Sequence, residues 1–360
     1  MSSPPTTPHR RYNPLLDEWV LCSPGRLSRP WQGQTEAAVD PRLPEYDPGC
    51  YLCPGNLRAN GERNPEYTTT FAFDNDFPAL RPRSGPPPAA HPGLLRSEPA
   101  FGVCRVLCFS PRHDLTLALM DAPGIRAVID AWAAETTRLA ARDGIRYVQV
   151  FENKGAMMGC SNPHPHCQVW ATEHVPSGPA RRLAAQRRHL EAHGRDLLGD
   201  YLAEELASGE RLVCRNEHWA ALVPYWAGWP FETLVIPLRA VADLPSLRPD
   251  ERDAAAELLG RLNRRYDNLF RCSFPYSMGW HGAPCDGAAH PYWRLHAGYF
   301  PPLLRSATVR KFVVGYELTA EAQRDITPEE AAARLRAVPE THFLAEAEAA
   351  ADPGAVRVRG

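Results

Sequence analysis

The chain has 360 residues, a hydrophobic fraction of 44%, a charged fraction of 23% and a formal net charge of −2. This composition is ordinary for a globular protein of one large domain or two smaller ones, and it lacks the basic excess typical of proteins that bind nucleic acid or anionic membranes. No apolar run is long enough to span a bilayer, and the first residues lack the apolar core of a signal peptide. We therefore expect a cytoplasmic protein without membrane or nucleic-acid partners.

Alternating and helical patterns of apolar residues predict the elements in chain order. Expected strands cover residues 18–22, 68–73, 101–110, 147–153, 210–216, 219–224, 231–237, 274–280, 292–300 and 309–316. Expected helices lie within 122–141, 178–209, 249–270 and 327–338, while residues 1–14 form a loose arm. Asp121 can cap the first helix, and Thr327 opens a capping box at the last one.

The succession of strands, a helix and more strands occurs twice, with few βαβ units. This pattern predicts an α+β fold with mainly antiparallel sheet and a possible internal duplication. We divide the chain into an N-terminal half at 1–177, a C-terminal half at 178–345 and a frayed tail at 346–360.

A short polar run, Ser161 to Gln168, contains two histidines one residue apart. In an extended segment, His164, His166 and Gln168 would share one face of a strand. Asn162-Pro163 before them indicates a turn into that strand. From these residues alone, a polar surface strand and a reactive site are both open interpretations.

A C-x-x-C knuckle, Cys50 to Cys53, precedes Pro54-Gly55. Two thiolates at this spacing can converge on one tetrahedral ion, and the following proline and glycine argue against a redox helix. With no second C-x-x-C, histidines must supply the other ligands, and His113 and His164 would complete a Cys₂His₂ site. Such a closed site would be structural and would leave His166 as the reactive imidazole.

Two arginines, Arg26 and Arg29, lie three residues apart in a loop. Guanidiniums offer paired donors that suit phosphate groups. Two solvated arginines are the plainer interpretation of these residues taken alone.

Several long runs together resemble the galactose-1-phosphate uridylyltransferase family, the transferase branch of the histidine-triad superfamily. They are CYLCPGN at 50–56, SNPHPHCQ at 161–168, Phe231-Glu232, FPYSMGWHGAP at 274–284 and LRSATVRKF at 304–312. The resemblance covers about residues 8–343 and implies a duplicated histidine-triad-like fold, with a half-barrel of mainly antiparallel sheet flanked by helices.

The resemblance also implies a ping-pong reaction that supports galactose metabolism. UDP-glucose gives its uridylyl group to a histidine and releases glucose 1-phosphate, and galactose 1-phosphate then takes the group as UDP-galactose. The nucleophile corresponds to His166 and the supporting amide to Gln168. Substrate-binding positions correspond to Asn75, Asp76, Asn153, Gly159, Cys160 and Ser161 for the nucleotide, to Lys311, Phe312, Tyr316, Glu317 and Gln323 for the hexose, and to Arg26 and Arg29 for phosphate.

The family likeness further implies a structural zinc and a homodimer whose partner subunit supplies the arginine pair. Some members also carry an iron-type site of one Glu and three His. Here His281 and His296 remain, but Arg182 and Gly298 stand where the Glu and the third His align, so we expect no iron site. Possible substitute ligands without further support are Glu173, His174 and His290.

Two other functions remain open at this point. One is a related nucleotidyl enzyme, such as a dinucleotide phosphorylase or a sugar nucleotidyltransferase using another base, which the hexose-side run at 311–323 disfavours. The other is a zinc-stapled module that binds nucleotide or nucleic acid without catalysis, which the near-neutral charge disfavours.

Overall fold

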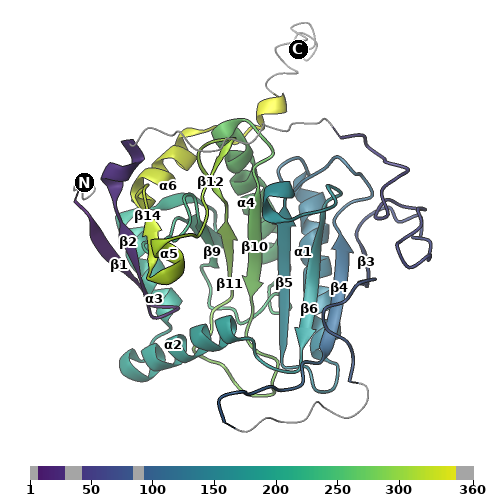
Figure 1. The fold of residues 1–360 in the computed structure, drawn as a ribbon, viewed down its shortest axis with the longest axis horizontal. Coiled ribbons are helices and arrows are strands. Elements are labelled where there is room, and N and C mark those ends of the chain that lie inside the picture. The colour runs from purple at the N-terminus through teal and green to yellow at the C-terminus, as the bar shows by residue number, and fades with distance from the viewer. Residues whose placement is uncertain (1–6, 29–42, 84–92, 346–360) are drawn as a thin grey trace, which may run out of the picture.

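A single nine-stranded antiparallel sheet forms the centre of the molecule (Figure 1). The computed structural model describes residues 7–28, 43–83 and 93–345. In spatial order the strands are β3 (Phe71–Asp74), β4 (Gly102–Cys108), β6 (His166–Thr172), β5 (Tyr147–Lys154), β10 (Tyr276–His281), β11 (His296–Phe300), β9 (Thr233–Pro237), β8 (Trp219–Leu222) and β7 (Leu212–Arg215). The α+β, mainly antiparallel prediction is confirmed.

Both halves of the chain contribute to this sheet. β3 to β6 come from the first half and β7 to β11 from the second, and the halves meet where β5 pairs with β10. In that pairing Lys154 lies opposite Tyr276 and Val150 opposite Trp280. The sheet therefore runs continuously through both halves, while their treatment as two domains remains a prediction.

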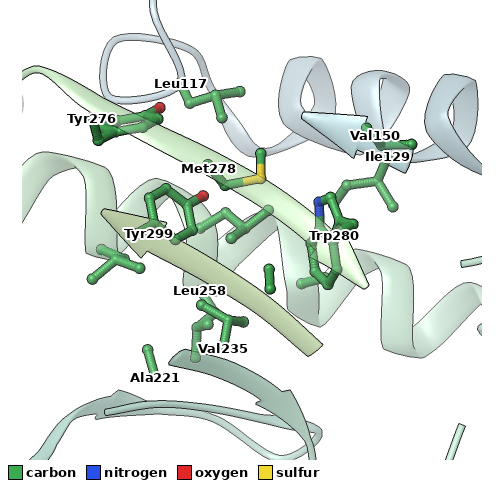
Figure 2. Packing of buried hydrophobic residues seen from close by; sticks show 14 of the residues in the cluster. Leu117, Ile129, Val150, Ala221, Val235, Leu258, Tyr276, Met278, Trp280 and Tyr299 are labelled. Carbon is green, nitrogen blue, oxygen red and sulfur yellow. The ribbon is translucent and has the colours of Figure 1, made fainter. Parts of the chain in front are cut away.

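Helices α1 (Ala122–Ala140) and α4 (Pro249–Phe270) pack against each other and cover one face of the sheet (Figure 1). The side chain of Asp121 accepts a hydrogen bond from the backbone N–H of Gly124 at 2.9 Å, so the predicted cap is confirmed. Ile129 from α1 and Leu258 from α4 meet Trp280 from β10 in the main hydrophobic core (Figure 2). Burial of large side chains of this kind dominates the folding free energy.

The remaining helices differ in part from expectation. The helical stretch 178–209 is two helices, α2 (Ser177–His193) and α3 (Leu197–Ser208), because Gly194 adopts a φ of 69° and ends the first. Thr327 caps α6 (Pro328–Ala337) by accepting the N–H of Glu330 at 3.2 Å, as predicted. The short elements are α5 (Tyr316–Thr319) and the 3₁₀ turns η1 (Pro24–Ser28) and η2 (Ala156–Met158).

A second, three-stranded sheet lies beside the main one. It consists of β1 (His9–Asn13), β2 (Glu18–Cys22) and β14 (Ala322–Arg324), with β14 parallel to β2. The prediction of a loose arm is therefore wrong for residues 9–13. Arg11 is only 2% exposed and forms an ion pair with Glu329 at 2.8 Å, which fixes this strand to the C-terminal half.

The predicted strand at 309–316 is also wrong. Only β13 (Val309–Arg310) pairs with β12 (Leu303–Ser306), and the chain then leaves the extended conformation. Gly315 has φ 57° and ψ −121°, which is outside the β region and directs the chain into α5. Among the described residues, no helix is long and apolar enough to cross a membrane.

Candidate functional site

Four buried side chains, from the knuckle and from two loops beside the main sheet, form a compact Cys/His cluster. The ligand atoms of Cys50, Cys53, His113 and His164 all lie within 4.8 Å of one another. Tight turns bring the two thiols together, since the N–H of Cys53 donates to the carbonyl of Cys50 at 3.2 Å. Two thiols and two imidazoles in this arrangement fit a closed tetrahedral zinc site.

Contacts outside the cluster orient His164 toward it. Its Nε2 lies 3.0 Å from the carbonyl oxygen of Ser110, which makes Nε2 the protonated nitrogen and leaves the Nδ1 lone pair facing Cys53 at 3.5 Å. An outer hydrogen bond of this kind typically fixes the tautomer of a metal-binding histidine. Burial lowers the pKa of His164 to about 4 and raises that of Cys53 to about 11.

The prediction that His164 shares a strand face with His166 is wrong. β6 begins only at His166, and His164 lies in a bend before it. The side-chain oxygen of Asn162 accepts the backbone N–H of His164 at 2.9 Å and holds this bend. The backbone is bent at His164 and extended at His166. This difference separates the imidazole of the metal cluster from the reactive imidazole.

His166 is the first residue of β6 and lines a cavity of about 540 Å³. Its Nδ1 lies 2.8 Å from the carbonyl oxygen of His164, so Nδ1 carries the proton and Nε2 carries the lone pair. Burial lowers the pKa of His166, which favours the neutral ring. Nε2 has no hydrogen-bond partner within the described part of the chain, and a neutral imidazole in this state can act as a nucleophile.

The walls of the His166 cavity come from the end of β5 and the following turn. Asn153, Cys160 and Ser161 line it, all predicted nucleotide-binding positions. Gly155 adopts a φ of 86°, and a Cβ there would lie 3.1 Å from the Cβ of Pro275, so the turn passes close to the opposite wall. Gly159 also has a positive φ, 77°, at the end of η2. Gly155 lines the cavity, so its backbone forms part of the wall, whereas Gly159, a predicted nucleotide-binding position, is not in the lining.

Gln168 lies on β6 beside two other predicted positions, but it does not line the His166 cavity. Its Oε1 accepts hydrogen bonds from Trp170 Nε1 at 2.9 Å and from Asn75 Nδ2 at 3.5 Å. The neighbouring Asp76 forms an ion pair with Arg58 at 3.4 Å. The structure thus brings Gln168 and Asn75 together in hydrogen-bonded positions.

Two charged residues, Glu152 and Lys154, also line the His166 cavity, and neither was predicted from the sequence as a site residue. Burial raises the pKa of Glu152 to about 7, and its carboxyl accepts the hydroxyl of Tyr276 at 3.0 Å. Lys154 Nζ donates to Asp267 at 2.8 Å. The sequence does contain a signal for both residues. Side chains alternate between the two faces of a strand, so Glu152 and Lys154 lie on the same inward face as the core residue Val150.

A second cavity, also of about 540 Å³, contains the predicted hexose-side residues. Its lining includes Lys311, Phe312, Tyr316, Glu317 and Gln323, together with Arg26. Lys311 is ion-paired with Glu317, and Arg26 with Asp325. Arg310 lines both this cavity and that of His166. Arg29 lies outside the described residues.

Comparison with solved structures supports a class of enzyme. The structure of a uridylyltransferase matches with a TM-score of 0.73 and 26% identity, covering 91% of this chain and 97% of that one. An ADP-glucose phosphorylase from Arabidopsis thaliana matches in fold, with a TM-score of 0.72 at 23% identity over 92% of this chain and all of the other. Fold, histidine site and sequence relatives together define a nucleotidyltransferase with a histidine-triad-like fold.

Sequence comparison identifies the family. The N-terminal domain of galactose-1-phosphate uridyl transferase matches residues 3–176 and the C-terminal domain matches residues 182–347. The galactose-1-phosphate uridylyltransferase of Rattus norvegicus is 58% identical over 93% of this chain and 89% of its own, and that of Haemophilus influenzae is 52% identical over 94% and 97%. This chain belongs to the galactose-1-phosphate uridyl transferase family.

Proposed function

We propose that this protein transfers a uridylyl group from UDP-glucose to galactose 1-phosphate through His166, in galactose metabolism. The observation that carries the proposal is the state of the His166 ring: Nδ1 is held by the carbonyl of His164 at 2.8 Å, and Nε2 keeps its lone pair at the wall of a cavity. This arrangement supports nucleophilic attack without a separate base, because the neutral imidazole needs no deprotonation.

The reaction consists of two displacements at phosphorus. Nε2 attacks the α-phosphorus of UDP-glucose, a P–N bond forms, and the P–O bond to glucose 1-phosphate breaks. A phosphate oxygen of galactose 1-phosphate then attacks the same phosphorus, breaks the P–N bond and gives UDP-galactose. Positioning and charge neutralisation supply much of the acceleration in such a transfer.

The surrounding residues bind and orient the substrates in this proposal. Gln168 steadies the transferring phosphoryl group, and the cationic groups of the second cavity neutralise phosphate charge. The remaining contacts are Asn75, Asp76, Asn153, Gly159, Cys160 and Ser161 to the nucleotide, Lys311, Phe312, Tyr316, Glu317 and Gln323 to the hexose, and Arg26 and Arg29 to phosphate.

Zinc is the metal that we propose for the Cys50, Cys53, His113 and His164 cluster. Its role would be structural, because four protein ligands leave no position for substrate. A zinc ion there would join the knuckle to the residues that directly precede β6, and so fix the start of the strand that carries His166. We also propose that this protein is located in the cytoplasm.

A homodimer with shared active sites is the proposed assembly. Apart from Arg310, different residues line the two cavities, and the segment beside the second cavity exposes apolar side chains. Phe312 is 48% exposed, Val314 61% and Leu318 72%. Exposed apolar side chains gathered in one segment support contact with another protein surface, here a second copy of this chain.

Complementation tests the shared site. Assayed well below the KM for galactose 1-phosphate, His166→Ala is expected to be inactive and Lys311→Ala to keep about a tenth of wild-type activity. Mixed, dissociated and reassociated chains should recover about a quarter of wild-type activity, since half of the dimers are mixed and each of these holds one intact site. If each site lies within one chain, the mixture keeps only about a twentieth of wild-type activity.

Isotope exchange tests the reaction itself. Labelled glucose 1-phosphate should enter UDP-glucose without any galactose 1-phosphate present, because a ping-pong enzyme catalyses each half-reaction alone. His166→Ala should abolish exchange, whereas the control His193→Ala, on the exposed end of α2, should retain it. Exchange that persists in His166→Ala contradicts the proposal. A panel of other nucleoside diphosphate sugars separates it from a nucleotidyl enzyme for another base.

A further inference from the structure

A third cavity, of about 200 Å³, lies between the small sheet and the main sheet, away from His166. Its lining includes Asn13 and Val20 from the small sheet and, from the other side, Arg182 of α2, His281 of β10 and His296 of β11. Arg182 aligns with the Glu ligand of the iron-type site expected in some family members. His281 and His296 align with two of its three His ligands.

The residues present do not fit a metal cation. Arg182 brings a positive charge that lowers the pKa of both His281 and His296, after the larger effect of burial. The Phe300 ring occupies the space that a side chain at position 298 would take, because a Cβ on Gly298 would lie 2.7 Å from Cζ of Phe300. Within residues 7–28, 43–83 and 93–345, the Cys50 cluster is the one group of three or more His, Cys, Asp or Glu ligands that is close enough to share an ion.

Polar atoms at this cavity are buried without hydrogen-bond partners in the described protein. They are Nε of Arg182, Nδ1 of His281 and Nε2 of His296. His296 is 1% exposed, and its Nδ1 lies 2.9 Å from the carbonyl oxygen of Arg294, so Nδ1 is the donor and Nε2 presents a lone pair. A buried polar atom without a partner costs about 1–3 kcal/mol, so three at one cavity indicate a ligand that pairs with them.

Arg182 is the cationic side chain of the cavity lining, and its guanidinium forms no salt bridge within the described part of the chain. The two carboxylates of the lining already have partners. Oε2 of Glu232 accepts the N–H groups of Gly228 at 2.7 Å and Trp229 at 3.0 Å, and burial raises the pKa of this carboxyl. Glu18, which also lines the cavity, is ion-paired with Arg181 at 2.6 Å.

We propose that this cavity binds a small protonated oxyanion of the phosphate type. Its charged oxygens accept hydrogen bonds from the guanidinium of Arg182, and its hydroxyl donates to Nε2 of His296. A neutral His281 can contribute a donor or an acceptor at Nδ1. Because the lining comes from both sheets and α2, the bound anion stabilises the contact between them. This binding is independent of the proposed transfer reaction.

Isothermal titration with inorganic phosphate tests this site, with UMP present at saturation to occupy the nucleotide phosphate positions near His166. We expect Arg182→Met to weaken phosphate binding at this site at least about tenfold, and His296→Phe to weaken it similarly, since each removes a hydrogen bond in a buried site. Arg182→Lys should retain part of the affinity, because it keeps the charge but loses the planar donor pair. Arg188→Met, an exposed arginine of the same helix, is the control and should bind as the wild type does.

Metal content and circular dichroism of each variant separate loss of binding from loss of fold. If Arg182→Met misfolds, Arg182→Lys and His296→Phe decide. The proposal is overturned if wild type, Arg182→Met and His296→Phe bind phosphate with equal affinity. It is also overturned if the wild type shows no phosphate binding that depends on Arg182. A second equivalent of divalent metal bound by the wild type also overturns it, since the cavity would then hold a cation.

Discussion

Replacing Asp267 by Asn should be one of the most destabilising single-atom changes in this protein. The Asp267 carboxylate is the counter-ion of Lys154, whose Nζ lies 2.8 Å away at the wall of the His166 cavity. The side chains are 3% and 7% exposed, so little water reaches either charge. The carboxylate also accepts the N–H of Phe274 at 2.9 Å and lies 3.2 Å from Nε2 of His342.

The expected magnitude follows from what Asn keeps and what it loses. Its carbonyl oxygen can still accept the N–H of Phe274, so the backbone contact survives. The negative charge is lost, and the buried ammonium of Lys154 remains without a counter-ion. Removing one partner of a buried ion pair typically costs about 3–5 kcal/mol in the free energy of unfolding, and the retained hydrogen bond places Asp267→Asn near 3 kcal/mol.

Urea unfolding followed by circular dichroism measures this loss. Lys154→Met in the Asp267→Asn background should restore at least about 1 kcal/mol, because it removes the uncompensated charge. Arg188→Met breaks an exposed contact with Asp17 and serves as the control, with a cost below about 1 kcal/mol. A cost for Asp267→Asn no larger than that of the control, or a double variant less stable than Asp267→Asn alone, would refute the reasoning.

Three further predictions address the metal cluster, the buried acid and the hexose side. Cys50→Ala should lower zinc from about one equivalent per chain to a small fraction of that by elemental analysis, since three ligands hold zinc much less well than four; unchanged zinc would contradict the assignment. Burial raises the pKa of Glu152 in the folded protein from 4.5 to about 7. Between these two values the unfolded chain loses the proton more readily than the folded one, so the free energy of unfolding falls as pH rises. Glu152→Gln should therefore be more stable than wild type by on the order of 2–3 kcal/mol at pH 8 and by little below pH 4, and a pH-independent difference in unfolding free energy counts against this. Lys311→Ala should raise KM for galactose 1-phosphate roughly tenfold in steady-state assays by removing a charged contact, and an unchanged KM argues against its role.

Elements with strong local signals could be predicted from the sequence. The first long helix has a capping Asp121 and an apolar stripe that includes Ile129, and both the cap and the core position are observed. The knuckle at Cys50 and Cys53 likewise depends on residues close in sequence, and its turns are held by local backbone hydrogen bonds.

Features that depend on distant partners could not be predicted in the same way. The pairing of β14 with β2 brings Ala322 opposite Val20, and no local pattern indicates that contact. The ion pair of Lys154 similarly depends on Asp267, which lies 113 residues further along the chain. Strand parity could have placed Lys154 inside, but only the folded structure shows which carboxylate compensates it.

The orientation of the two site histidines shows a different limit. Strand periodicity assumes a regular extended backbone, and the bend held by Asn162 breaks that regularity just before β6. His164 therefore turns to the cysteines. Cys167 follows the strand rule, since it is 1% exposed and accepts a hydrogen bond from Trp132 Nε1 at 3.2 Å in the core.

The most direct test of the central claim is peptide mass spectrometry after the protein is mixed with UDP-glucose alone. The transfer through His166 predicts one uridylyl group per active site, attached to the peptide that contains His166 and removed when galactose 1-phosphate is added. A protein that forms UDP-galactose from these substrates without any such adduct, or with the adduct on another residue, would contradict it.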